Sequence, residues 1–94
     1  MSILRRVPPD VRAHVPKGER LLAWARVHPG GVAVATDTAL YLPVPHMMRF
    51  SWDLIAKATF TEEGVLVVEG RQDVRSPDRA WRVLLEESRA LPTV

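Results

Sequence analysis

Apolar and polar residues alternate over long stretches of the chain, which is the pattern of half-buried β-strands. In residues 20–28 (RLLAWARVH) one set of alternate positions is wholly apolar, while the other becomes polar toward its end. Successive side chains of a strand point to opposite faces, so this segment predicts a strand that leaves the core at its far end. The runs VAVAT (32–36) and ALYLP (39–43) follow a PGG turn and predict a hairpin, with Asp37 in the connecting turn.

The alternation changes within the segment MMRFSWDLIAKATF (47–60). Trp52 and Leu54 continue the parity set by Phe50, but a new alternation begins at Ile55. A strand has a side-chain period of two, so it cannot keep one face buried through this change unless it bends or bulges. The segment therefore predicts a corner between two strands.

Two further strands and a helix are expected in the last third of the chain. VLVVEG (65–70) predicts a strand that is apolar on both faces, and RQDVR (71–75) predicts a short final strand. The segment 76–92 (SPDRAWRVLLEESRALP) has the period of an amphipathic helix, with Ser76 as N-cap and Pro77 at the first helical position. We expect this helix to bury its apolar stripe against the tryptophan-containing corner. The stripe consists of Trp81, Leu84, Leu85, Ser88 and Leu91.

The beginning of the chain is more basic than the rest. The first 26 residues hold six basic and two acidic side chains, whereas the remainder holds seven basic and nine acidic ones. In residues 7–19 (VPPDVRAHVPKGE), Pro9 suits a first helical position, which predicts one or two helical turns that end before Pro16. We therefore divide the chain into an N-terminal arm (1–16) and a single domain (17–94).

Composition narrows the class of protein. The 94 residues suffice for one domain, and 47% hydrophobic with 26% charged residues is typical of a globular protein. The absence of cysteine excludes disulfides and thiolate metal sites. No apolar run reaches the length of a signal peptide core after the first arginines, or of a membrane span, so we expect a cytoplasmic protein.

Four segments occur in a fixed order: GERLLAWARV, GGVAVATDTALYLP, RFSWDLIAKATF and GVLVVEG. With the closing amphipathic segment, they resemble the short pleckstrin-homology-like (PH-like) proteins of high-GC bacteria, in which a GE-(apolar)-x-AWA strand, a VAT hairpin, a WxxI corner and a helix follow one another. The resemblance covers residues 17–91. It implies a mainly β (α+β) fold, a bent antiparallel sheet or partly open barrel of five to seven strands closed by a C-terminal amphipathic helix.

The resemblance implies no catalytic residues. Larger PH domains often bind phosphoinositides through a basic first hairpin. The corresponding segment here, RVHPGGVAV, has only Arg26 and His28 as basic side chains, which counts against inositide binding.

Side chains that could carry chemistry are few and scattered. His14, His28 and His46 have no HxH or HxxxH spacing, so the sequence predicts no metal site. No glycine-rich loop has the spacing of a phosphate site, and no serine has a nucleophile-elbow context. Trp24 has arginines nearby, as a nucleic-acid site would, but is more simply a core residue. We therefore predict no enzyme, cofactor, nucleic-acid partner or small-molecule substrate.

The segment PVPHMMRF (43–50) indicates a contact surface. Its prolines interrupt ladder pairing, which places a sheet edge or a corner there. Its adjacent methionines require that one of them face away from the core if the segment is extended, unless Met48 packs inward and Met47 covers a barrel rim. Our main hypothesis is a non-enzymatic interaction module that binds a protein partner or itself, as a homodimer, through this edge. Its candidate residues are Pro43, Pro45, His46, Met47, Met48 and Arg49.

An alternative hypothesis is a peripheral module that binds anionic lipid, at most weakly, through Arg5, Arg6 and Arg12 of the N-terminal arm. A solvated terminus without a function explains the same charges. The two binding hypotheses differ in salt dependence, because a basic arm loses its attraction for lipid as ionic strength rises, whereas an apolar contact does not.

Overall fold

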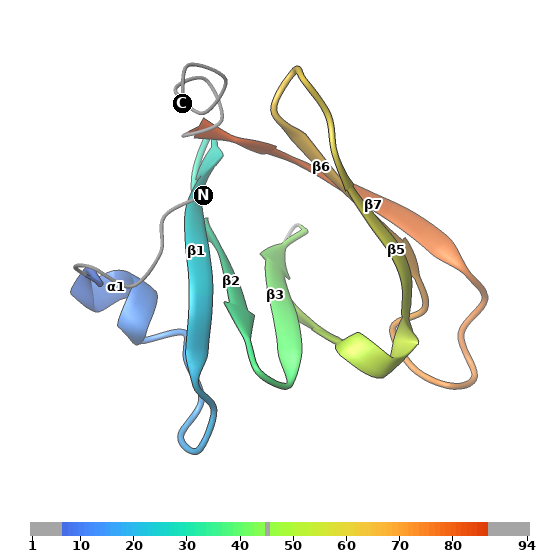
Figure 1. The fold of residues 1–94 in the computed structure, drawn as a ribbon, viewed down its shortest axis with the longest axis horizontal. Helices are drawn as coiled ribbons and strands as arrows, with labels where there is room; N and C mark the ends of the chain where they lie inside the picture. Colours follow the sequence, from blue (N-terminus) through green and yellow to red (C-terminus); the bar gives the residue numbers. More distant parts are fainter. Residues whose placement is uncertain (1–6, 45, 87–94) are drawn as a thin grey trace.

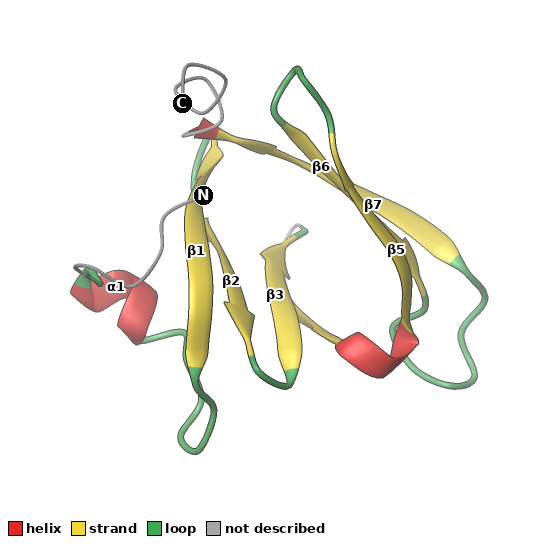
Figure 2. Cartoon of the chain, viewed as in Figure 1, coloured by secondary structure: helices red, strands yellow, loops and turns green. Residues whose placement is uncertain are grey.

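Seven antiparallel strands make up most of the structure (Figures 1 and 2), a computed structural model that describes residues 7–44 and 46–86. The order across the sheet is β4-β3-β2-β1-β7-β6-β5. The elements are α1 (Pro9–Arg12), β1 (Leu21–His28), β2 (Val32–Thr36), β3 (Ala39–Pro43), β4 (Met47–Ser51), the 3₁₀-helix η1 (Trp52–Leu54), β5 (Ile55–Phe60), β6 (Val65–Gly70) and β7 (Arg79–Leu85).

Strand β1 joins two halves of the sheet. It pairs with β2 over most of its length and with β7 only at its end, where Val27 lies opposite Leu85 and His28 opposite Leu84. Figure 1 shows β1–β3 on one side and β5–β7 on the other, with β7 reaching β1 at the top. The sheet does not close into a barrel, because β4 and β5 stand at the two ends of the strand order.

The predicted strands of the first 70 residues are confirmed closely. The predicted hairpin runs 32–36 and 39–43 are β2 and β3, and the predicted strand 65–70 is β6. The short helix begins at Pro9 and ends before Pro16, as the prolines indicate. The predicted corner is η1, a single 3₁₀ turn that separates β4 from β5.

Gly70 brings the end of β6 against this corner. A Cβ atom at Gly70 would lie 2.3 Å from the carbonyl oxygen of Leu54 and 2.9 Å from the Cα atom of Ile55. The next residue, Arg71, donates its amide to the same Leu54 oxygen at 3.0 Å. Only glycine allows this approach, so Gly70 helps to fix the position of the corner.

The predicted helix that begins at Ser76 or Pro77 is wrong, since residues 79–85 form strand β7. Six of them pair with β6, from Gly70 opposite Arg79 to Val65 opposite Leu84. Trp81, Val83 and Leu85 alternate as strand residues do, and two of these three also belong to the helical stripe, so the local pattern fits both structures. Pairing with β6 decides between them. Ser88 and Leu91 lie outside the described residues.

The predicted final strand at 71–75 is also wrong, because this segment is the loop between β6 and β7. The Asp73 carboxylate accepts the amides of Arg75 and Ser76 at 2.9 and 3.0 Å, which shapes a local turn. These amides lower the pKa of Asp73, the Arg75 amide most strongly. Ser76 is therefore part of a loop and not an N-cap. The helices that can be bounded within residues 7–44 and 46–86 are α1 and η1, and neither is the predicted C-terminal helix.

Apolar side chains pack on both faces of the β1–β4 half. The inner face, which is turned toward β5–β7, carries a cluster that extends across both halves. Phe50 is fully buried there, and its ring lies 4.6 Å from that of Trp81. Trp52 is 37% exposed and donates its Nε1 hydrogen to the Thr36 carbonyl oxygen at 2.7 Å. The inner cluster consists of Ala25, Val27, Ala33, Ala35, Leu40, Leu42, Phe50, Val68, Val83 and Leu85.

The opposite, outer face of β1–β4 is covered by the beginning of the chain. Residues 7–19, which we call the N-terminal strap, include α1, which lies beside β1 on the side away from β5–β7 (Figure 1). Val11 of the strap is fully buried. Because the sheet is covered on two faces, strand residues of both parities are apolar. The outer cluster consists of Val11, Trp24, Val32, Val34, Ala39 and Tyr41.

Candidate functional site

The predicted contact residues lie on β4 and in the turn before it. Strand β4 pairs with β3 from Pro43 opposite Met47 to Ala39 opposite Ser51, and it is one end of the strand order. Pro43 therefore ends a paired strand, and the sheet edge lies along β4. Pro45 lies outside the described residues.

The side chains of these residues point in different directions. Met47 packs against the outer cluster and Met48 against the inner cluster, and both are half-buried. Pro43 is half-buried close to Gly31, where a Cβ atom would lie 3.1 Å from its Cγ. His46 and Arg49 are exposed. The side chains thus do not converge on one site.

The backbone of β4 has hydrogen-bonding groups on both sides, one row toward β3 and one row away from it. The Trp52 amide donates to the Thr38 oxygen at 3.4 Å, and the Val44 amide to the His46 oxygen at 2.9 Å. Bonding direction alternates along an antiparallel strand, so residues of even number on β4 turn their backbone groups toward β3. Those of Met47, Arg49 and Ser51 face away from it.

Strand β5 forms the other edge, which was not predicted as a site. The Thr61 amide donates to the Val65 oxygen at 2.9 Å, so by the same alternation Ala58 and Phe60 turn their backbone groups away from β6. All of β5 after Ile55 is exposed, and the Phe60 side chain is 45% exposed. The register shifts near Ile55, and such a bulge weakens regular pairing at that end.

A polar cluster on the outer face was missed by the sequence analysis. Glu19 Oε1 accepts hydrogen bonds from the Thr36 hydroxyl at 2.7 Å and from the Tyr41 hydroxyl at 2.9 Å. Arg49 Nε donates to the Tyr41 oxygen at 3.3 Å. The bond from Thr36 is the main reason why the pKa of Glu19 is lowered, and burial raises the pKa of Tyr41. The only sequence signal was an acidic residue at a turn, which is common on any surface.

The three arginines of the lipid hypothesis are not seen together. Arg12 is exposed in the last turn of α1, whereas Arg5 and Arg6 lie outside the described residues. Asp10, also on α1, forms an ion pair with Arg26 of β1, and this hydrogen bond is the main cause of the lowered pKa of Asp10. The negative charge of Asp10 in the strap is therefore paired within the protein.

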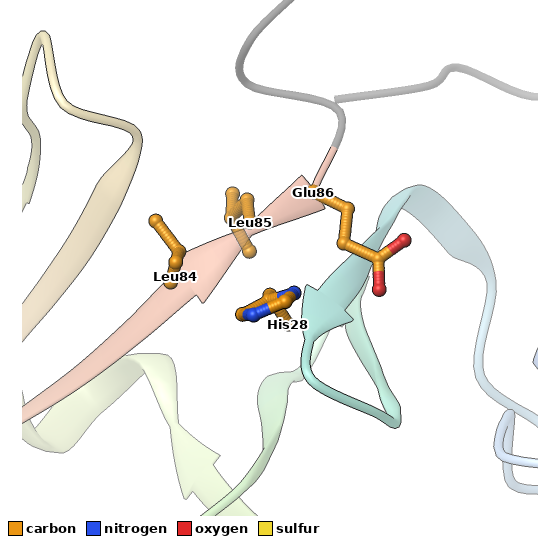
Figure 3. Close-up of a pocket in the computed structure, with 4 residues that line it drawn as sticks. All are labelled: His28, Leu84, Leu85 and Glu86. Atoms are coloured by element: carbon orange, nitrogen blue, oxygen red, sulfur yellow. The ribbon is translucent and has the colours of Figure 1, made fainter.

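Described residues line pockets at two places in the sheet. The first, of ≈ 350 Å³, is formed by His28 at the end of β1 and by Leu84, Leu85 and Glu86 at the end of β7 (Figure 3). The described lining residues supply an imidazole and a carboxylate to this pocket, with no nucleophilic side chain among them. Two smaller pockets, of ≈ 240 and ≈ 320 Å³, share Ala56 and Asp78 beside the loop that follows β6.

Groups of metal-ligating side chains and membrane-spanning helices are absent from the part of the chain that the structure describes. Among residues 7–44 and 46–86, no three His, Asp or Glu side chains are grouped so that they could hold a metal ion. No helix in the same residues is both long and apolar enough to cross a membrane. Comparison with protein-family models, with curated proteins and with solved structures found no match to this chain.

Proposed function

We propose that this protein is a non-enzymatic PH-like interaction module, which binds a protein partner or a second copy of itself by adding a strand to an exposed sheet edge. The observation that supports the proposal most is that β4 stands at one end of the strand order, with β3 paired on one side of it only. An unpaired row of backbone groups is a template for another extended chain. Backbone bonds would supply the affinity.

The β4 edge is suited to a two-fold pair. In an antiparallel pair of identical strands, the residue at the centre lies opposite its own copy. With Arg49 at the centre, the two copies of this positively charged residue would lie opposite each other, which destabilises the pair. A centre at Met48 or Phe50 avoids this and places Arg49 opposite Met47 or Ser51 of the second copy. In either pairing, the backbone groups of β4 that face away from β3 lie opposite those of the second copy and can form hydrogen bonds with them.

Proline at Arg49 tests the role of the edge. This substitution removes an outward-facing amide but leaves the bonds to β3, since Leu40 and Phe50 form the neighbouring pair. We expect wild type to associate reversibly in sedimentation equilibrium and Arg49→Pro to be monomeric. Arg49→Ala is the matched control, because it loses the same side chain and keeps the amide, so it should associate like wild type.

The same variants test binding to another protein. A genuine strand-addition partner from the native cell should bind immobilised wild type and Arg49→Ala and should be lost from Arg49→Pro. Ala58→Pro, with Ala58→Ser as its control, gives the corresponding test for the β5 edge. The proposal is wrong if wild type is monomeric and none of the captured proteins distinguishes the proline variants from their controls.

A further inference from the structure

The N-terminal strap is attached to the sheet by side chains. Val11 is buried in the outer cluster, and Val7 and Val15 are partly buried against it. The backbone hydrogen bonds of the strap run within it, as from the Val11 amide to the Pro8 oxygen at 3.1 Å and from Glu19 to Pro16 at 3.1 Å. The strap therefore packs on the sheet through its side chains and is not one of its strands.

Two carboxylates tie the strap down at positions nine residues apart. Asp10 binds Arg26, and the Arg26 guanidinium lies 5.5 Å from the centre of the Trp24 ring. Glu19 binds Thr36 and Tyr41, at 2.7 and 2.9 Å. The charged groups that face these carboxylates are Arg26 for Asp10 and, beyond the Tyr41 hydroxyl, Arg49 for Glu19. Each tie is therefore strengthened by a negative charge on the strap, since hydrogen bonds to an ionised carboxylate are stronger than those to a neutral acceptor.

The closed arrangement leaves a buried polar group unsatisfied. The Nε1 hydrogen of Trp24 is buried and has no hydrogen-bond partner among residues 7–44 and 46–86. A buried donor without a partner is unfavourable, and it would gain water if the strap moved away. This gain partly offsets the loss of apolar contacts on opening.

We propose that the N-terminal strap is a latch, which opens as a unit while the seven strands remain folded and thereby uncovers an apolar sheet face around Trp24 and Tyr41. The hydrogen bonds within the sheet do not involve the strap, so they survive its release. Local opening of this kind has a lower free energy than global unfolding. Neutralising Asp10 or Glu19 weakens a tie and shifts the latch toward the open state. This proposal is independent of the sheet-edge function.

Single cysteines can measure the opening directly, because the chain contains none of its own. Val11→Cys places a thiol under the strap, and Val68→Cys places one in the inner cluster, where the native valine is equally buried. At pH 7 we expect Val11→Cys to react with a thiol reagent at least about tenfold faster than Val68→Cys, as local opening requires. Adding Asp10→Asn or Glu19→Gln should accelerate the reaction at position 11 several-fold and leave position 68 unchanged.

Equal reaction rates at the two positions would show that the strap unfolds only with the sheet, and the latch would then be rejected. The same holds if the carboxylate variants accelerate both positions equally. Hydrogen exchange of the Trp24 indole gives a second test without a cysteine. Asp10→Asn should accelerate that exchange relative to wild type while the backbone amide of Val68 keeps its protection, and unchanged indole exchange would contradict the proposal.

Discussion

Strands β1–β4 bury apolar side chains on both faces, whereas the β5–β7 half turns an apolar face inward and leaves its edge strand β5 exposed. One face of β1–β4 is covered by the strap, and the other face packs against β5–β7. The second half has fewer fully buried side chains, with Val68, Val83 and Leu85 in the inner cluster and Phe60 partly exposed. The difference indicates that the stability of the sheet depends mainly on β1–β4.

Two phenylalanines on the inner face provide the strongest test of this difference. Phe50→Ala removes a fully buried ring that packs on Trp81, and we expect a loss of about 3–5 kcal/mol in the free energy of unfolding. Phe60→Ala removes a ring that is 45% exposed and should cost distinctly less. Urea unfolding of both variants measures this, and equal losses would mean that the two halves are equally well packed.

Gly70→Ala tests the contact between the second half and the corner. Its new methyl group would meet the Leu54 carbonyl at 2.3 Å, so the backbone has to move, and we expect a loss of about 1–3 kcal/mol. Gly30→Ala is a suitable control, since a Cβ atom there meets nothing within 4 Å. Thermal unfolding of the two variants should show a lower stability for Gly70→Ala. A stability equal to that of wild type would show that the backbone of the corner can shift at little cost in free energy.

Val11→Ala tests whether the strap contributes to the stability of the first half. Truncation removes two carbon atoms from a fully buried side chain, which corresponds to about 1.6 kcal/mol at ~0.8 kcal/mol per carbon. Val74→Ala, in the exposed loop before β7, should change stability little. Urea unfolding compares the two, and a neutral Val11→Ala would mean that the strap adds nothing to the sheet.

The smallest expected effect concerns pH. The pKa values of Asp10 and Glu19 are lower in the folded protein than their ordinary values of 3.8 and 4.5. The unfolded chain therefore binds protons first, and the stabilisation present above about pH 5 is lost as pH falls through the folded values. Unfolding curves between pH 6 and 3 should show this decline. A double variant, Asp10→Asn with Glu19→Gln, should show a shallower one, and an identical slope would contradict the role of these two carboxylates.

The sequence predicted elements correctly where local signals agree with one another. The hairpin of β2 and β3 combines apolar runs with a turn at Asp37, and α1 is bounded by prolines. Strand β7 was mistaken for a helix because Trp81 and Leu85 satisfy both periods. Pairing with β6 selects the strand, and the pattern within residues 76–92 does not reveal this pairing. Pro43 and Pro45 predicted a sheet edge or a corner, and the edge strand β4 follows them in the sequence.

The strap shows what an alternation pattern cannot reveal. Apolar residues on both faces of β1 and β2 indicate that both faces are covered, but they do not identify the cover. A single buried valine among charged residues gives almost no periodic signal. The Glu19 cluster depends on Thr36 and Tyr41, which approach Glu19 only after the sheet has formed. Such contacts between distant segments cannot be predicted from spacing.

The pairing of β1 with β7 has a consequence for the rate of folding. Neighbouring strands elsewhere are joined by short connections, so their hairpins form by closing small loops. The contact of Val27 with Leu85 instead joins the first and the last strand of the described chain, and it involves only two opposed pairs. Closing so long a loop costs entropy before much contact is gained. We therefore expect the two halves to acquire their hairpins early and the β1–β7 pairing to form late in folding.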